Sequence, residues 1–336
     1  MVTIYDIAKR ADVSAMTVSR VINNSGRISP KTREKVKRIM EEMNYVPNST
    51  ARSLVKQETK MLSLLITDIM NPFFTTLARG AEDAALKLGY KLLFGNSDEK
   101  LSKEKEYVDM VLSTRVDGVL FAPASDESAD HLAALQRHRI PFVLVDRDVP
   151  GIEADIVVGE NREGADRLTS HLIRLGHRRI AIVNGLSTVS TARERFAGYV
   201  DALNRNGIPF DESLSLECGF NRFDDPEPLD RMLALPDPPT AIFAANNVLA
   251  VGVIGYLRDR NIGVPDLMSV ACFEDVGLAS ALDPFLTVAM QPAYEFGYQG
   301  VKLLVERIRS KDTAERRIVR LPTDMIVRRS TGRPPV

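Results

Sequence analysis

The sequence predicts a small all-α helix-turn-helix domain followed by a larger α/β body of two parallel-sheet lobes. The chain has 336 residues, enough for two or three domains. Residues 1–60 hold 12 Lys and Arg against 6 Asp and Glu, whereas the remainder holds 32 against 39, so a basic module precedes an acidic body. Helical periodicity dominates the first 45 residues, and from Leu62 onward short apolar runs alternate with longer helical patterns.

Three short helices are predicted in the basic module. Thr3 can cap a first helix that ends near Arg10, and Ser14 can cap a second helix over residues 15–23. Ser29, followed by proline at the first helical position, begins a third helix. Two helices joined by so short a turn form a helix-turn-helix unit, which places its second helix in the major groove of DNA.

The outward face of the second helix supplies candidate base contacts. Arg20 can place its guanidinium on a guanine edge, Met16 can touch a thymine methyl, and neighbouring hydroxyls can reach phosphates. The positive charge of the module favours nucleic acid as its partner, because Lys and Arg neutralise phosphates. On helical spacing alone, an ordinary solvated three-helix domain remains the alternative.

The motifs of this region add a specific resemblance. The strings T-I-Y-D-I-A-K-R-A-D-V-S, T-V-S-R-V-I-N, G-R-I-S-P-K-T-R-E-K-V and N-Y-V-P-N-S-T-A-R-S-L resemble the lactose-repressor/galactose-repressor (LacI/GalR) family of bacterial transcription factors. The resemblance continues through the chain. It implies a DNA-binding domain over 1–47 and a hinge helix with its linker over 48–60. The hinge would insert Leu54 into the minor groove beside its symmetry mate, whereas a flexible linker with an incidental leucine is the alternative.

The outward face of the second helix and the family resemblance together give the expected DNA contacts. Hinge residues Arg52 and Lys56 would supply positive charge near the phosphates. The DNA-contacting residues expected in this way are Tyr5, Ser14, Ala15, Met16, Thr17, Ser19, Arg20, Asn23, Asn48, Ala51, Arg52, Leu54 and Lys56.

The acidic body shows the alternation of strands and helices that is typical of parallel sheets covered by helices. Candidate strands begin near residues 62, 91, 118, 142, 179, 241 and 269. Helices are expected over 74–88 and 166–175. Each is followed by a glycine, Gly89 or Gly176, where a left-handed C-cap is favoured.

The same resemblance implies that this body is a periplasmic-binding-protein-like domain, whose chain crosses three times between its lobes. The first lobe is expected over 61–160 and 291–322, and the second over 161–290 and 323–336. Ligands of open α/β sheets lie beyond the carboxyl ends of the strands. We therefore expect the loops that follow the strands to line a cleft between the lobes.

Those loops carry side chains suited to a polyol. Arg195 is the strongest candidate, because a planar guanidinium can bind neighbouring oxygens in two places. Phe74 could instead belong to the core. Glu274 stands where the family usually has Asp, so the ligand or its pose should differ from that of the best-known sugar repressors. The expected effector-binding residues are Phe73, Phe74, Asp146, Arg147, Asn161, Arg195, Phe220, Asn246, Glu274 and Gln291.

Catalytic and secretory signatures are lacking. No phosphate loop, dinucleotide fingerprint, H-E-x-x-H or C-x-x-C motif occurs, so we expect no enzyme activity, no cofactor and no metal. The first ten residues contain no apolar signal segment, which predicts a cytoplasmic protein without membrane contact, nucleoid-associated when bound to an operator. Cys218 and Cys272 are then expected to be free thiols.

The expected function is that of a transcriptional regulator, most often a repressor in this family, whose operator affinity is set by a small effector such as a sugar or sugar derivative. A transport-type sugar-binding protein is one alternative, and the basic first 60 residues argue against it. An enzyme acting on a carbohydrate in the cleft is the other, and turnover of a bound sugar would support it. A pseudo-palindromic operator requires a two-fold protein, so a homodimer is expected. No leucine heptad follows the last expected strand near Met325, so no tetramer is expected.

Overall fold

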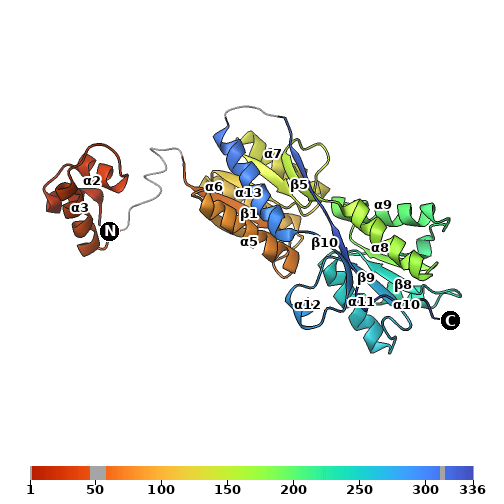
Figure 1. Cartoon of the computed structure of the whole chain (residues 1–336). Coiled ribbons are helices and arrows are strands. Elements are labelled where there is room, and N and C mark those ends of the chain that lie inside the picture. The colour runs from red at the N-terminus through yellow and green to blue at the C-terminus, as the bar shows by residue number, and fades with distance from the viewer. Residues whose placement is uncertain (1, 46–57, 222, 224, 311–314, 336) are drawn as a thin grey trace. The chain divides into compact units, whose positions relative to one another are not determined.

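The chain folds into two compact units, Met1–Thr59 and Lys60–Val336. The first is helical and the second consists of strands and helices (Figure 1). The residues described by this computed structural model are 2–45, 58–221, 223, 225–310 and 315–335.

The described residues of the first unit form three helices: α1 (Ile4–Ala11), α2 (Ala15–Ile22) and α3 (Pro30–Glu42). Each begins at the predicted cap. Thr3 forms a reciprocal capping box with the aspartate three residues on, and Ser14 and Ser29 each accept a hydrogen bond from the backbone N–H three residues on. The buried side chains that hold the helices together are Ile7, Ala8, Ala11, Val18, Val21, Val36 and Ile39. The three predicted helices are confirmed, with ends within one residue of expectation for the first two.

The described residues of the second unit form two six-stranded sheets. The first sheet is entirely parallel and has the order β11-β5-β4-β3-β1-β2. Its strands are β1 (Met61–Ile66), β2 (Lys91–Asn96), β3 (Gly118–Phe121), β4 (Phe142–Val145), β5 (Asp155–Gly159) and β11 (Ile318–Leu321).

The second sheet has the matching order β12-β10-β9-β8-β6-β7, and only β12 is antiparallel to its neighbour. Its strands are β6 (Ile180–Asn184), β7 (Ser215–Glu217), β8 (Ala241–Ala244), β9 (Ser269–Phe273), β10 (Thr287–Met290) and β12 (Asp324–Ile326). Following the chain, the strands pass from the first sheet to the second after β5, return at β11 and pass again at β12. We call each sheet with its covering helices a lobe.

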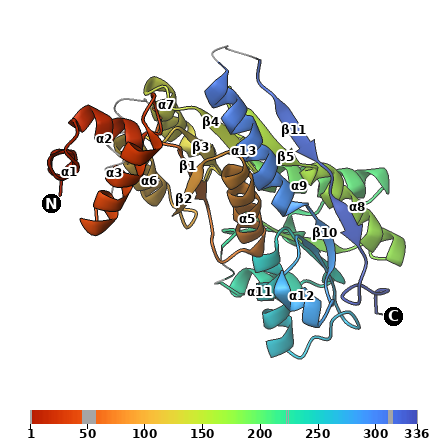
Figure 2. The same ribbon diagram turned by 60° about the vertical axis from the view of Figure 1, so that its left-hand side comes forward.

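Helices cover both sheets (Figure 2). The first lobe has α5 (Pro72–Lys87), α6 (Leu101–Thr114), the short η1 (Asp126–Ser128), α7 (Ala129–Arg137) and α13 (Ala293–Arg309). The second lobe has α8 (Asn161–Leu175), α9 (Ser190–Arg205), η2 (Glu212–Leu214), α10 (Glu227–Leu233), α11 (Asn247–Asp259) and α12 (Leu278–Leu282).

Helices α5 and α13 lie side by side although some 200 residues separate them in the chain (Figures 1 and 2). Their close approach requires glycine on both sides. A Cβ on Gly80 would lie 2.0 Å from the carbonyl oxygen of Tyr294, and one on Gly297 would lie 1.9 Å from that of Leu77. The crossing thus ties the late helix α13 to the start of the first lobe.

All seven candidate strands are present, but the sequence prediction missed β5, β7, β10 and β11. Two of these, β7 and β11, are only partly buried, so they lack the continuous apolar run of an interior strand. Helix α8 begins at Asn161 rather than at residue 166, because its first turn carries the exposed Arg162 and Glu163 and so lacks an apolar period. Gly176 has the expected left-handed C-cap, with φ of 109°.

Both cysteines are free, as expected. Cys272 is fully buried, and burial raises the pKa of its thiol. Within the described ranges, no helix combines the length and the apolar character needed to cross a membrane.

Candidate functional site

The first unit presents one face of α2 to solvent. Met16 is 64% exposed, Tyr5 on α1 is 72% exposed, and Arg20 is also exposed. The guanidinium of Arg20 makes no hydrogen bond or ion pair within the described part of the chain. Its aliphatic stem runs past Gly26, where an added Cβ would lie 3.3 Å from the Cδ of Arg20. This geometry leaves the charged end of Arg20 available to a partner.

The small polar residues of α2 already have local bonds. The hydroxyls of Ser14 and Thr17 lie 3.0 Å apart, and Ser14 also caps the helix. The Asn23 amide donates to the hydroxyl of Ser19 at 3.3 Å. Ala15 is half-buried. The other expected DNA contacts, Asn48, Ala51, Arg52, Leu54 and Lys56, lie outside the described residues.

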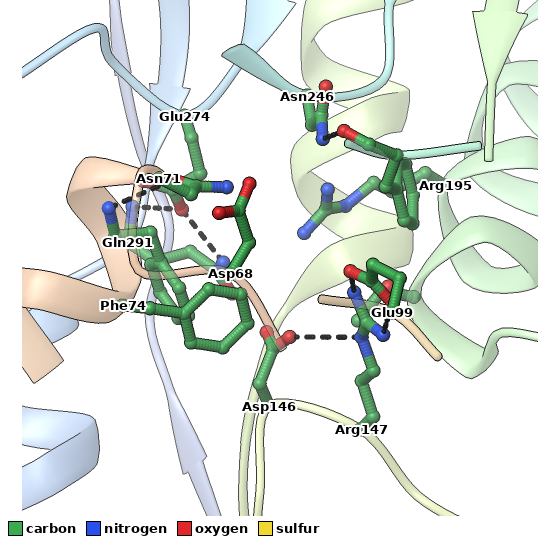
Figure 3. A pocket seen from close by; sticks show the side chains of 13 residues that line it. Asp68, Asn71, Phe74, Glu99, Asp146, Arg147, Arg195, Asn246, Glu274 and Gln291 are labelled. Carbon is green, nitrogen blue, oxygen red and sulfur yellow. Dashed lines mark hydrogen bonds and ion pairs between the residues drawn. The ribbon is translucent and has the colours of Figure 1, made fainter. Parts of the chain in front are cut away.

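In the second unit, a narrow cleft with an internal volume of about 30 Å³ lies where the carboxyl ends of both sheets meet. Most of its lining follows directly after strands of the two lobes, as expected for open α/β sheets. Figure 3 shows the side chains arranged around one shared space. The lining residues are Asp68, Asn71, Phe73, Phe74, Glu99, Asp146, Arg147, Thr191, Arg195, Phe220, Asn246, Glu274 and Gln291.

The structure therefore brings together nine of the ten expected effector residues and places the tenth, Asn161, directly behind them. Asn161 is buried and accepts a hydrogen bond from Nε of Arg195 at 2.9 Å. Asn161 therefore holds Arg195 in position and does not itself line the cleft.

Arg195 is held on several sides. It is 5% exposed, its Nη1 donates to the carbonyl of Ala245 at 2.6 Å, and its guanidinium stacks 3.9 Å from the ring centroid of Phe273. Its Nη2 makes no hydrogen bond in the part of the chain that the structure describes. Burial lowers the pKa of Arg195, but the neighbouring carboxylates oppose this. Arg195 can therefore offer a fixed donor to a ligand oxygen in the cleft.

Arg147 is engaged differently. Its two terminal nitrogens bind both oxygens of Glu99, at 2.6 and 2.7 Å, and Nη1 also donates to two backbone carbonyls. The buried pair is bidentate and neutral overall. The guanidinium of Arg147, one of the expected effector-binding residues, is thus already occupied by Glu99.

The two lobes place a carboxylate at equivalent positions. Asp146 follows β4 and Glu274 follows β9, each the third strand in the order of its sheet. Both have left-handed backbones, with φ of 69° and 73°. Such a conformation costs a non-glycine residue about 1 to 2 kcal/mol and concentrates at functional sites. The kinks turn both carboxyl groups, 6% and 7% exposed as residues, into the cleft.

Burial changes the protonation of these acids. It raises the pKa of Glu274 to about 7 from an ordinary value of 4.5, although hydrogen bonds from Gln291 and the charge of Arg195 oppose the rise. Burial also raises the pKa of Asp146 and of Asp68. The cleft thus holds acids that are costly to ionise without a partner.

The remaining expected residues mainly shape the cleft. Asn246 caps α11 and donates to the carbonyl of Phe220 at 2.8 Å, so both ends of its amide are used. Gln291 donates to Glu274 at 2.7 Å. The Phe220 ring lies 5.8 and 5.7 Å from the guanidinium carbons of Arg147 and Arg195.

Phe73 and Phe74 are both buried and pack against each other with ring centroids 5.1 Å apart. Both belong to the core of the first lobe as well as to the lining of the cleft. Phe74 is therefore both a core residue, as the alternative held, and part of the cleft wall.

Four lining residues were absent from the expected set: Asp68, Asn71, Glu99 and Thr191. The first three follow β1 and β2 closely in T-D-I-M-N and S-D-E. The rule that strand-end loops line the cleft could have found them. Thr191 stands in the first turn of α9, where no motif marks it.

Polar contacts join the lobes on both sides of the cleft. Asp126 of the first lobe binds Arg193 of α9 through two bonds of 2.6 and 3.1 Å. On the other side, Asn247 at the start of α11 donates to the side-chain oxygen of Asn71 at 3.0 Å. The two lobes of the second unit are therefore in direct contact. No group of metal-binding side chains occurs in the described sequence ranges.

Comparisons with known proteins match both units. Residues 3–48 match the family model of the bacterial regulatory proteins of the lacI family, and residues 169–331 match that of a periplasmic binding protein-like domain. The transcriptional regulator DegA of Bacillus subtilis (strain 168) is 40% identical over 98% of each chain. The transcriptional repressor PurR of Aliivibrio salmonicida is 33% identical over 98% of this chain and 99% of its own length.

Solved structures share the whole arrangement. The complex of the transcriptional regulator CelR with cellobiose is 30% identical, with a TM-score of 0.72 over 98% of this chain and all of that chain. The lac repressor dimer bound to operator and the anti-inducer ONPF is 26% identical, with a TM-score of 0.83 over 98% of this chain and 99% of that one. These similarities confirm the predicted fold class, and these proteins carry the names of regulators, which supports the prediction of a non-enzyme.

Proposed function

This chain belongs to the LacI family of bacterial transcriptional regulators, and we propose that it is a repressor whose operator affinity is set by a sugar or sugar derivative bound between the two lobes. The observation that carries the proposal is the cleft at the carboxyl ends of both sheets, in which Arg195 presents an unused donor beside several acids. The polar groups of the cleft are held in place by their neighbours, as in a preformed binding site that fixes the orientation of its ligand.

The proposed DNA-contacting residues fall into two groups, exposed side chains that contact bases and locally hydrogen-bonded side chains that contact the DNA backbone. Arg20 and Met16 on α2 read base edges in the major groove, because they project from the helix without local partners. Ser14, Thr17 and Ser19 have local hydrogen bonds and contact the backbone of the operator. The residues from 48 to 60 form the hinge, and Leu54 enters the minor groove.

A polyol fits the chemistry of the cleft. Carboxylates accept hydrogen bonds from hydroxyls, Arg195 donates to ring or hydroxyl oxygens, and aromatic faces cover C–H groups. The bound cellobiose of the related CelR structure supports a carbohydrate as the ligand class. Arg147, whose fork is taken by Glu99, and Asn161, which holds Arg195, position their neighbours instead of binding the ligand.

A homodimer is part of the proposal, because a two-fold operator requires it. The second lobe carries apolar side chains that no other part of the described chain covers: Val251 on α11 is 57% exposed, and Leu278 and Leu282 on α12 are 90% and 91% exposed. Exposed apolar patches are typical of interfaces. We assign these three side chains to the contact between copies, and light scattering should find dimers.

Control by the ligand follows from two-state linkage. The two lobes, which we place at 61–160 plus 291–322 and at 161–290 plus 323–336, change their relative arrangement when the cleft is filled or emptied. That change alters the spacing of the two hinge segments in the dimer and therefore the affinity for the operator in the cytoplasm.

The test combines a thermal-shift screen with a DNA-binding assay on the full-length dimer. Monosaccharides, disaccharides, sugar phosphates and purines are screened for a rise in melting temperature, and an operator is selected from random duplexes. We expect a carbohydrate to raise the melting temperature and to change operator affinity at least tenfold. Stabilising ligands that leave operator affinity unchanged would refute the linkage, and stabilisation by purines alone would refute the ligand class.

A further inference from the structure

The charges that line the cleft do not balance. The lining contains four carboxyl side chains, Asp68, Glu99, Asp146 and Glu274, but only two arginines, Arg147 and Arg195. Glu99 and Arg147 neutralise each other through two short hydrogen bonds. Three carboxyl groups therefore remain against the single charge of Arg195.

The three remaining carboxyl groups keep oxygen atoms available for a ligand. Asp146 accepts no close hydrogen bond from the described residues, and its nearest cationic atom is Nε of Arg147 at 3.5 Å. Glu274 receives both of its hydrogen bonds, from the backbone and the side chain of Gln291, on Oε1 alone. Asp68 uses one oxygen for the backbone N–H of Met70.

The surroundings do not supply the missing positive charge. Arg193 is paired with Asp126 at the edge of the cleft. Arg328 is paired with Asp275, directly after Glu274, and Lys103 with Asp98. These three cations are thus already neutralised by acids of their own.

An uncompensated carboxylate is expensive to bury. Asp146 and Glu274 are 6% and 7% exposed and come from different lobes, so closure of the lobes brings both into the same dry space. A neutral polyol would leave the excess negative charge in place or force a carboxyl group to take up a proton. A ligand that carries its own positive charge would remove this cost.

Resting on the proposed function, we propose that the effector is an amino sugar whose protonated amine binds between Asp68, Asp146 and Glu274. An ammonium group has three donors and no acceptor, which matches the available carboxylate oxygens. Arg195 then binds a ring or hydroxyl oxygen of the same molecule through Nη2. Asp146 and Glu274, one from each lobe, also link recognition of the amine to lobe closure. Figure 3 shows these side chains around the shared space.

The experiment is calorimetric titration of the full-length protein at pH 7 in 0.15 M salt. The probes are glucosamine, galactosamine and mannosamine, each compared with its neutral parent hexose and its N-acetyl derivative, which lacks the charge. We expect at least one amino sugar to bind tenfold or more tightly than both of its neutral counterparts.

Two isosteric variants locate the effect. Glu274→Gln removes one cleft charge and should reduce the preference for the amine at least tenfold, and Asp146→Asn should do the same if Glu274→Gln fails to fold. Glu106→Gln, on the exposed surface of α6, is the matched control and should leave the preference unchanged.

The outcomes separate this inference from the proposed function. Binding of neutral sugars as tight as that of their amino counterparts would overturn the amino-sugar inference and leave the sugar-controlled repressor standing. An amine preference that survives both cleft variants would also overturn it. Absence of binding by every one of these probes would overturn the amino-sugar inference alone, whereas absence of any stabilising carbohydrate from the wider thermal-shift screen would overturn the proposed function.

Discussion

Arg20 on the recognition helix and Arg195 in the cleft carry the same side chain in opposite settings. Arg20 is exposed and has no polar partner within the described residues. Arg195 is 5% exposed and bound to Asn161, to Ala245 and to the face of Phe273. A surface that reads DNA gains its partners only on binding, whereas the cleft is organised before the ligand arrives. Substitutions on the exposed DNA-reading face should therefore affect binding alone, whereas substitutions in the cleft should affect stability and binding together.

The largest effect is expected for Arg20→Ala. Loss of a bidentate contact to a base costs about 1 to 3 kcal/mol. A dimer loses two such contacts, so the free energy of operator binding should become less favourable by about 2 to 6 kcal/mol. The free energy of unfolding should change by less than about 0.5 kcal/mol, since the side chain lies on the surface. Fluorescence anisotropy on the selected operator and urea unfolding measure the two quantities.

Arg38→Ala, on the exposed side of α3, is the matched control for Arg20→Ala. An equal loss of operator affinity in the two variants would show that Arg20 contributes only general positive charge. Arg20 would then not be a base-reading residue, and the contrast between Arg20 and Arg195 would no longer hold.

Glu274→Gln should alter stability in a pH-dependent way. Because burial raises the pKa of Glu274 to about 7 from 4.5, the native state retains a proton that the unfolded state releases between these values. The contribution of Glu274 to the free energy of unfolding of the wild type therefore decreases as pH rises from about 4.5 to about 7. Glutamine cannot ionise, so the variant should gain up to about 3 kcal/mol over wild type between pH 4 and pH 8.

Urea unfolding of the ligand-free proteins at the two pH values measures this difference, with Glu106→Gln as the control. A stability difference that is the same at pH 4 and pH 8 would show that Glu274 titrates as an ordinary carboxyl group. The cleft would then be open enough to water to hydrate its acids.

Arg195→Lys keeps the charge but removes the planar fork. Because hydrogen bonds of charged groups contribute about 1.5 to 3 kcal/mol, effector affinity should fall about 10- to 100-fold. Operator affinity of the ligand-free protein should stay within about twofold, since α2 is unchanged. Arg205→Lys, in an exposed ion pair on the same helix, should affect neither. Calorimetry that found full effector affinity in Arg195→Lys would place the ligand away from this side chain.

The smallest effect is expected for Ser29→Ala, which removes the cap of α3. Such caps contribute about 1 kcal/mol, so the first unit should unfold more readily while effector affinity is unchanged. Ser25→Ala is the control, because the structure gives the side chain of Ser25 no hydrogen bond. The rate of protease cleavage in the first unit measures this loss of stability, and it should be higher in Ser29→Ala than in Ser25→Ala. Equal cleavage rates in the two variants would contradict the role of the cap.

Local rules of the sequence predicted much of this molecule. The caps at Thr3, Ser14 and Ser29 and the stripe of buried residues on each helix depend on neighbours three or four positions away. Most effector residues follow strand ends, where parallel sheets place their ligands. The strands β7 and β11 escaped because partly buried edge strands lack a continuous apolar run.

The sequence by itself determined the basic reading unit, the family and the set of polar loops, because each is written in spacing, charge or motif. Only the tertiary structure decided that Glu99 occupies the fork of Arg147, that Asn161 orients Arg195, and that acids of both lobes face one space. These are pairings across 34 residues or more, formed when two sheets close on each other. Their charges add up only in three dimensions, which is why an excess of carboxylates in the cleft cannot be read from the chain.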